Sequence, residues 1–394
     1  MFSDRLPSDL RPNRLAEALA NRRQRNQPII DLTASNPTRA GFSYPDDLLA
    51  PLSDPRGLTY APEPLGLLEA RQAVVADFAR RGLTTTADRI ALTASTSEAY
   101  SLLFKLLCAP GDEVLIPRPS YPLFDHLTRL DAVTAVPYEL EYHAKWSIDV
   151  GSIERGFSEK TRAVLLVSPN NPTGQFAGAA EIEAIAAYCR AQGAALISDE
   201  VFADYEFSPT QDLRSGLLLG RTDVVGFTLG GLSKSIALPQ AKLAWIALSG
   251  ADEPLPRVRA RLELVCDTYL SVSTPIQLAT AELLHRGAVV RHQIQERVRS
   301  NYQLLGARTT DVPSCELLEA DGGWYAVLRV PSIMSEEDLV LGLLAEDGVL
   351  VHPGYFFDFP RESFLVVSLL PPTDRFADGV SRILGRFDRA SDRP

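Results

Sequence analysis

The chain has 394 residues, 45% of them hydrophobic and 23% charged, which is ordinary for a folded globular protein with a sizeable core. Its formal net charge of −11 argues against nucleic acid or an anionic membrane as a partner, because both require a basic face. No apolar stretch is long enough to cross a bilayer, and four widely spaced cysteines and five unclustered histidines indicate neither a disulfide framework nor a metal site. The composition therefore predicts a cytoplasmic protein without a bound metal.

The first eighty residues alternate short regular segments with loops. A helical pattern at 15–25 is followed by a possible short strand at 29–32 and by a loop of turn-forming residues at 33–38. A second irregular stretch at 58–66 precedes an amphipathic helix at 67–81. This region therefore supplies helices and loops but only one short strand.

From residue 90 onward, short apolar strands alternate with helices. The strands are expected at 90–93, 114–116, 163–168, 194–198, 224–229 and 243–248. Helices are expected at 95–107, 123–130 and 179–192. Strands that are apolar throughout and separated by helices predict an α/β fold with a mostly parallel sheet covered on both faces.

The character of the chain changes after Pro275. Long helical stretches give way to separated strands and a last helix, at 277–305, 322–329, 348–353, 364–370 and 376–387. This order predicts a second, smaller domain of the α+β class. We expect a large domain at 43–276, and a small domain built jointly from the segments 1–42 and 277–394.

Polar side chains stand at the ends of three predicted strands: Asn171, Asp199 and Lys234. Each is weak evidence alone, since an Asn-Pro motif is usually a turn and a lysine after a strand is usually a surface charge. Their separations of 28 and 35 residues, however, each match about one strand–helix–strand unit. Because ligands bind beyond the carboxyl ends of strands in open α/β sheets, we expect the three side chains to converge on one crevice.

The predicted helix start at Ser95-Thr96-Ser97 adds free backbone N–H groups and the positive end of a helix dipole, which suit a phosphate. Lys234 follows an apolar run and two glycines, and a desolvated lysine forms Schiff bases with carbonyl compounds. A phosphate seat, an amine, a carboxylate and an amide together suit a phosphorylated carbonyl cofactor whose ring nitrogen the carboxylate keeps protonated.

With these residues in this order, the chain resembles the fold-type I pyridoxal-phosphate enzymes of the class I/II aminotransferase family, from Asn36-Pro37 to the last helix. The resemblance implies an aspartate aminotransferase-like fold, with a mostly parallel sheet of the seven-stranded type and a smaller α+β domain. It implies pyridoxal 5'-phosphate as cofactor, small-molecule donors and acceptors of an amino group, and a homodimer with shared active sites. The expected reaction is exchange of an amino group between an amino acid and a 2-oxo acid.

The resemblance also gives each candidate residue a role. Lys234, after Ser233, corresponds to the Schiff-base lysine, and Asp199 to the carboxylate that pairs with the pyridine nitrogen. Asn171 corresponds to the amide that bonds the phenolic oxygen of the cofactor. The ring-stacking aromatic, the phosphate-binding turn and the tyrosine that reaches over from a neighbouring subunit correspond to Tyr121, to Ser95, Thr96 and Ser97, and to Tyr60.

Three cofactor positions depart from the family pattern. Gly231 stands where a phosphate-binding serine or threonine is common, and Lys242 stands where the family usually has arginine. Phe202 replaces a tyrosine that shares the phenolic oxygen, and Tyr205, three residues on, is the candidate replacement.

The fourth departure concerns the substrate. The segment 367–371 aligns so that Val366 stands where the family has an arginine that clamps the substrate carboxylate, a bidentate contact that valine lacks. Asn36, Arg39 and Arg361 are the candidates for substrate contact. Two alternatives therefore stay open: another pyridoxal-phosphate reaction (elimination, decarboxylation or carbon–carbon bond formation), and a cofactor-sensing regulatory domain, against which the acidic charge argues.

Overall fold

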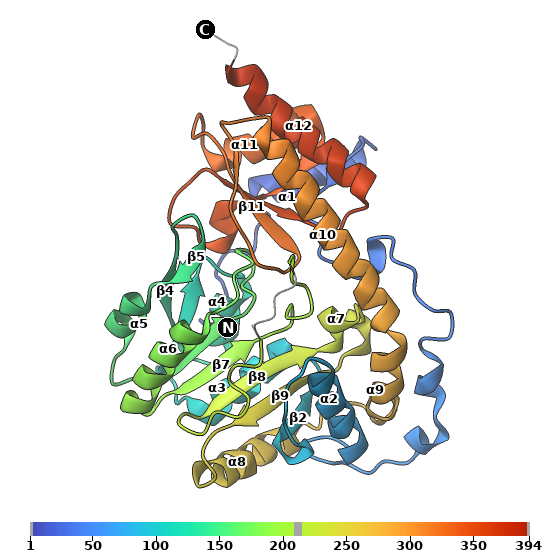
Figure 1. Cartoon of the computed structure of the whole chain (residues 1–394), viewed down its shortest axis with the longest axis vertical. Helices are drawn as coiled ribbons and strands as arrows, with labels where there is room; N and C mark the ends of the chain where they lie inside the picture. The colour runs from blue at the N-terminus through green and yellow to red at the C-terminus, as the bar shows by residue number, and fades with distance from the viewer. Residues whose placement is uncertain (1–2, 209–214, 392–394) are drawn as a thin grey trace.

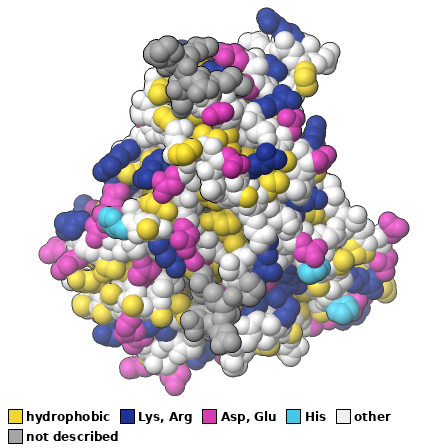
Figure 2. All heavy atoms as spheres, turned by 45° about the horizontal axis from the view of Figure 1, so that its top comes forward, with side chains coloured by type: hydrophobic (Ala, Val, Ile, Leu, Met, Phe, Trp, Pro, Cys, Tyr) yellow, Lys and Arg dark blue, Asp and Glu magenta, His cyan; other side chains and the backbone are white. Residues whose placement is uncertain are grey.

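The computed structural model describes residues 3–208 and 215–391, and it consists of a large sheet flanked by helices with a smaller body beside it (Figure 1). No helix in these two ranges is long and apolar enough to cross a membrane. The described side chains also hold no group of three or more His, Cys, Asp or Glu suited to a metal ion. Figure 2 shows hydrophobic side chains gathered in the middle of one face, with acidic and basic side chains interspersed around them.

The large sheet has eight strands. In spatial order they are β2 (Ile90–Thr93), β9 (Ala244–Ser249), β8 (Gly226–Gly231), β7 (Ala195–Asp199), β6 (Thr161–Val167), β3 (Glu113–Arg118), β4 (Thr134–Tyr142) and β5 (Trp146–Ile148). All pairs from β8 to β4 are parallel, whereas β9 and the three-residue edge strand β5 run antiparallel to their neighbours. The predicted α/β class with a mostly parallel sheet is confirmed.

Helices cover both faces of this sheet. They are α2 (Leu68–Arg80), α3 (Thr96–Leu107), α4 (Leu123–Leu130), α5 (Val150–Gly156), α6 (Ala179–Gln192), α7 (Leu232–Ser235), α8 (Pro254–Tyr269) and α9 (Thr274–Arg286). Val114 and Ile116 of β3 pack in one apolar cluster with α3 and α8, whereas Leu115 between them packs in another with α6. Successive side chains of a strand point to opposite faces, so a continuous apolar run is what a sheet covered twice requires.

The smaller body combines the N-terminal segment with the C-terminal third of the chain. Its elements are α1 (Arg14–Gln24), β1 (Ile30–Asp31), α10 (Ala288–Thr310), β10 (Glu316–Leu317), β11 (Tyr325–Arg329), α11 (Glu336–Gly342), β12 (Val349–Leu350), β13 (His352–Pro353), β14 (Phe364–Ser368) and α12 (Thr373–Ser391). An antiparallel sheet has the order β10-β11-β14-β13, and β1 pairs in parallel with β12. Figure 1 shows α10 and α12 running side by side over this sheet.

The helical stretch expected at 277–305 is in fact two helices that meet at Gly287. A Cβ at Gly287 would lie 2.7 Å from the Cβ of Ile236, so the chain passes too close to its neighbour there for any other residue. The first helix, α9, packs against α2, and both helices share an apolar cluster with β2 and β9 of the large sheet. The domain division at 276 stays a prediction, and the break between α9 and α10 at Gly287 is a second candidate for this boundary.

Candidate active site

A cavity of about 450 Å³ opens beyond the carboxyl ends of β7 and β8. The large sheet and the smaller body both contribute to its lining. Nine of the residues singled out in the sequence line it: Ser95, Thr96, Ser97, Tyr121, Asn171, Asp199, Ser233, Lys234 and Lys242. The structure thus brings the three strand-end side chains into one crevice together with the helix start.

Two glycines at the end of β8 set the position of the lysine. A Cβ at Gly230 would lie 2.6 Å from Nε1 of Trp245, and a Cβ at Gly231 would lie 2.9 Å from the Cβ of Ala244. Only glycine therefore allows β8 to pack this closely on β9 before the chain turns into the single turn α7, which carries Lys234. The same contact explains why no serine or threonine stands at position 231.

Gly231→Ser is expected to lower the free energy of unfolding by about 1–3 kcal/mol, because the new side chain overpacks the contact with β9. Urea unfolding followed by circular dichroism measures the change. Gly306→Ser is the matched control, since a Cβ there meets only a leucine methyl at 3.5 Å, an ordinary contact. A Gly231→Ser protein that unfolds at the same urea concentration as the control would show that this contact leaves room for a side chain.

The amine of Lys234 lies close to two aromatic rings, one of which, Phe202, also lines the cavity. Its Nζ lies 4.8 Å from the ring centre of Trp324 and 5.6 Å from that of Phe202. Burial lowers the pKa of Lys234 to about 8, and the negative charge of Asp199 opposes this shift. A lysine in this state holds a substantial fraction of neutral, nucleophilic amine near neutral pH.

Two tyrosines fix the turn that carries the lysine. The hydroxyl of Tyr205 donates to the carbonyl of Lys234, and the hydroxyl of Tyr44 donates to the carbonyl of Ala237 at 2.9 Å. Tyr205 is fully buried and lies outside the cavity lining. Its hydroxyl is bonded to the backbone of the turn that carries Lys234, so the role of replacing the phenol missing at Phe202 stays a prediction.

Asp199 is the last residue of β7, and its carboxylate is buried. Oδ2 accepts from the hydroxyl of Tyr100 at 2.5 Å, and Oδ1 accepts from the backbone N–H of Val201 at 3.0 Å. Burial raises the pKa of Asp199, while these two hydrogen bonds and the charge of Lys234 oppose the rise. Sequence reasoning missed Tyr100; the only signal was its position on the predicted helix, about one turn beyond the serine-rich start.

Asn171 and Tyr121 complete the middle of the cavity. The side-chain oxygen of Asn171 is buried and has no hydrogen-bond partner among the described residues. A buried unpaired amide oxygen costs about 1–3 kcal/mol, so a polar group of a bound molecule is the natural partner at this position. Tyr121 is 45% exposed and presents its ring to the same cavity.

The start of α3 forms the end of the cavity suited to an anion. Ser95 caps the helix by accepting from the backbone N–H of Glu98 at 3.1 Å. Glu98 in turn accepts from the backbone N–H of Ala94 at 2.6 Å and from the hydroxyl of Ser271 at 2.7 Å, which fixes the loop. The first N–H groups of the helix remain directed outward, and Lys242, in left-handed backbone conformation (φ 54°), adds a positive charge to the lining.

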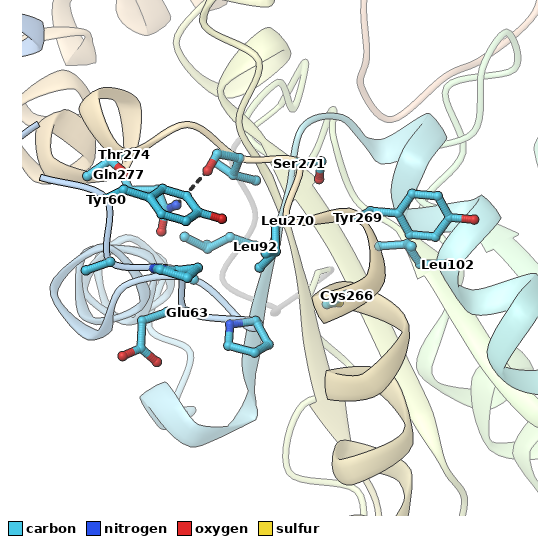
Figure 3. A pocket seen from close by; sticks show the side chains of 15 residues that line it. Tyr60, Glu63, Leu92, Leu102, Cys266, Tyr269, Leu270, Ser271, Thr274 and Gln277 are labelled. Carbon is cyan, nitrogen blue, oxygen red and sulfur yellow. Dashed lines mark hydrogen bonds between the residues drawn. The ribbon is translucent and has the colours of Figure 1, made fainter. Parts of the chain in front are cut away.

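Tyr60 does not line this cavity. It lies in a separate pocket of about 40 Å³ between the second irregular stretch and the end of α8, together with Tyr269 and Gln277 (Figure 3). The amide of Gln277 donates to the carbonyl of Val272 at 2.8 Å, which shapes this pocket. The side chain of Tyr60 is 76% exposed, so it is free to contact another molecule.

The three candidates for substrate contact also lie outside the cavity lining. The side-chain oxygen of Asn36 is engaged in its own turn, where it accepts from the N–H of Thr38 at 3.1 Å. Arg39 and Arg361 are exposed. None of the three residues lines the cavity in this structure, and a role for one of them in place of the missing arginine stays a prediction.

Position 366 itself offers no cation. Val366 is fully buried in the centre of β14, and Leu365 and Val367 on either side are equally buried and apolar. A shift of the alignment by one residue therefore brings no arginine to this strand. On the smaller body, the cavity is lined instead by residues that the sequence did not reveal: Ser35, Tyr325, His352, Phe356 and Phe357.

Taken from end to end, the cavity offers an anion seat, a nucleophilic amine, a buried carboxylate, an unpaired amide and an aromatic surface. These groups fit a phosphorylated aromatic aldehyde with a ring nitrogen and a phenolic oxygen, which is the description of pyridoxal phosphate. The unpaired oxygen of Asn171 and the buried, raised-pKa carboxylate of Asp199 are the two observations that most need such a partner.

Comparison with known proteins leads to the same family. The family model described as aminotransferase class I and II matches residues 27–376. An alanine aminotransferase of Mycobacterium tuberculosis is 28% identical over 91% of this chain and 85% of its own length. A glutamate-pyruvate aminotransferase of Haemophilus influenzae is 25% identical over 94% of this chain and 93% of its own.

A solved structure shares the fold over nearly the full length. The alanine aminotransferase from Pyrococcus furiosus superimposes with a TM-score of 0.85, at 22% identity, over 95% of this chain and 96% of that one. The fold is thus the aspartate aminotransferase-like fold that the resemblance implied. The chain therefore belongs to the class I and class II aminotransferases, the fold-type I pyridoxal-phosphate enzymes that exchange an amino group between an amino acid and a 2-oxo acid.

Proposed function

We propose that this aminotransferase binds pyridoxal 5'-phosphate covalently through Lys234 and uses the freed Lys234 amine as its general acid and base. The single observation that supports this most is the position of Lys234 Nζ: buried against Trp324 and Phe202, open to the cavity, and opposite the charge of Asp199. No other described lysine combines these features with a place beside the anion seat.

The remaining cavity residues would hold the cofactor. The start of α3 and Lys242 would hold its phosphate, and Asp199 its ring nitrogen. Asn171 would hold its phenolic oxygen, and Tyr121 would cover one face of its ring. When bound, the cofactor supplies a carbonyl carbon that receives the amino group and a ring that accepts electrons from the substrate's α-carbon.

The protein's own part is to move one proton and to exclude water. The neutral amine of Lys234 would accept the proton of the substrate's α-carbon at Nζ and would later donate it as general acid. Tyr205 and Tyr44 keep the turn in place while this occurs, through their bonds to the carbonyls of Lys234 and Ala237. Tyr100 keeps the Asp199 carboxylate oriented toward the cavity.

Capture of the cofactor is expected to depend on pH through Lys234. Only the neutral amine attacks a carbonyl, and the pKa of the free Lys234 amine is about 8. The rate should therefore rise about tenfold per pH unit below pH 8 and level off above it. Stopped-flow absorbance on mixing cofactor-free protein with pyridoxal phosphate measures this rate; a profile that keeps rising toward pH 10 would mean an unshifted lysine.

We further propose a homodimer in which Tyr60 of each chain serves the cavity of the other. Leu58, Tyr60 and Tyr269 are 91%, 76% and 53% exposed, and large exposed apolar side chains mark interaction surfaces. Tyr60 has no role in the cavity of its own chain, which supports a role in trans.

The four free cysteines support a reducing cytoplasm as the location.

The reaction is tested with the purified holoenzyme and a panel of amino acids that includes alanine, glutamate and phenylalanine. The names of the relatives make alanine with 2-oxoglutarate the first pair to try. Exchange appears as a change in the visible absorbance of the bound cofactor that a 2-oxo acid reverses. Release of ammonia or carbon dioxide would instead indicate one of the other pyridoxal-phosphate reactions, and no spectral response to any amino acid would indicate the regulatory role.

A further inference from the structure

The part of the cavity that faces the smaller body lacks arginine among the described residues. Its lining contains three basic side chains in all, those of Lys234, Lys242 and His352. Both lysines are assigned to the cofactor in the proposed function, on which the following inference rests. His352 is then the one basic side chain of the described lining that is left for a substrate.

His352 stands next to the position of the missing arginine. In the antiparallel pair of β13 and β14, it lies directly opposite Val366. Side chains of such a pair point to the same face, with Cβ atoms about 4.5–5.5 Å apart. Tyr325 occupies the same face, because it pairs with Ser368, two residues beyond Val366. Since Tyr325 and His352 both line the cavity, this face of the sheet is the one turned toward the substrate.

We propose that His352, as imidazolium, binds the carboxylate of the amino acid and 2-oxo acid substrates, in place of the arginine that Val366 displaces. His352 reaches the cavity from β13, the strand next to β14, on which Val366 occupies the position expected for the arginine. Ser35 and the hydroxyl of Tyr325 are the neutral donors on the same wall. The ring of His352 packs near the rings of Phe356 and Phe357, at 6.0 and 5.7 Å, which holds its orientation.

The charges around the ring suit a residue that gains a proton when a carboxylate arrives. Burial lowers the pKa of His352, while the carboxylate of Asp31 and a hydrogen bond to the backbone of Thr33 oppose this shift. Asp31 is itself fixed by Thr33, whose N–H and hydroxyl donate to it at 2.8 and 2.6 Å. The rings of Phe356 and Phe357 beside it and Val366 opposite it on β14 are uncharged.

The sign of the pH dependence follows from this arrangement. A bound carboxylate stabilises the imidazolium, so it raises the pKa of His352 above the value in protein without a bound carboxylate. Affinity for a carboxylate is highest at pH values below the pKa that His352 has when no carboxylate is bound. It falls by about tenfold per pH unit up to the pKa of the complex and is level beyond it. An arginine clamp would give no such dependence, because arginine stays charged throughout this range.

The test uses the holoenzyme and 3-phenylpropionate, an unreactive carboxylate whose ring suits the aromatic wall. Isothermal titration calorimetry gives the dissociation constant as a function of pH. Repeating it in buffers of different ionisation enthalpy gives the number of protons taken up. We expect uptake that approaches one proton near neutral pH, and affinity that falls as the pH rises. Binding without proton uptake at any pH overturns the inference, and this measurement needs no variant.

His352→Gln is expected to weaken binding of 3-phenylpropionate by about 10- to 100-fold, the size of one charge-assisted hydrogen bond, and to remove its pH dependence. In turnover it should raise KM with little change in kcat. His126→Gln, the same change on the exposed surface of α4, is the control and should match the wild type. If His352→Gln binds the probe as the wild type does, the inference is wrong while the amino-group exchange of the wild type stands; if the wild type exchanges no amino group, both proposals fall.

Discussion

Replacing Lys234 with alanine is expected to reduce amino-group exchange by about a thousandfold or more. Loss of a positioned general acid and base alone accounts for about 10²–10⁴-fold, and the variant also loses its covalent hold on the cofactor. Initial rates with the best donor of the panel measure the loss.

Lys242→Ala is the matched control, since it removes the other lysine of the same cavity. Lys242 is assigned to the phosphate, so its loss should weaken retention of the cofactor while turnover at saturating cofactor stays within about tenfold of the wild type. Dialysis followed by absorbance measures retention. The assignment would be reversed if Lys242→Ala abolished turnover and Lys234→Ala retained it.

A heterodimer of one Lys234→Ala chain and one Tyr60→Ala chain is expected to recover about half of the wild-type activity, if sites are shared across a two-fold interface. One of its two cavities combines the intact Lys234 of one chain with the intact Tyr60 of the other. Each parent homodimer has a defect in both cavities. Co-expression with two different affinity tags yields the heterodimer, and its rate is compared with that of each parent.

The control is a heterodimer of Lys234→Ala and Asp199→Ala chains. Both residues line the cavity of their own chain, so each cavity of this heterodimer carries one defect and no activity should return. If the Tyr60 heterodimer is no more active than its Tyr60→Ala parent, then Tyr60 does not act across an interface. A monomer in sedimentation would contradict the same proposal directly.

The sequence predicted those parts of the fold that are determined by local burial. β6, β7, β8 and β9 are almost entirely buried because helices cover both faces of the sheet, so each was visible as a mainly apolar run. β4 was missed, because its alternating exposed and buried residues and the interrupting Pro137 resemble a loop. The break at Gly287 was missed because glycine is required there by the close approach of Ile236. That residue is about fifty positions away, and no local pattern reveals the contact.

The candidate site divides in the same way. Residues that end strands or begin helices were identified, because a parallel sheet brings such ends to one edge whatever the details of packing. Tyr100 and Trp324 were not identified, since their contacts with Asp199 and Lys234 depend on how distant elements dock. The contact of Tyr205 with the backbone of Lys234 was not identified, because a spacing of three residues in a loop does not determine which group a side chain meets.

The close contact between Gly231 and Ala244 also limits the order in which a lineage accepts substitutions. A side chain at position 231 overpacks this contact while Ala244 is present, so a serine introduced there by a single mutation is expected to cost stability. Glycine at 244 would remove the nearest atom and leave backbone atoms of residues 244 and 243 at 3.1 and 3.2 Å, so the cost of serine at 231 is expected to be smaller after that change. While alanine stands at 244, a hydroxyl at 231 lowers stability. Contacts to a phosphate must then come from other residues, such as the start of α3 and Lys242.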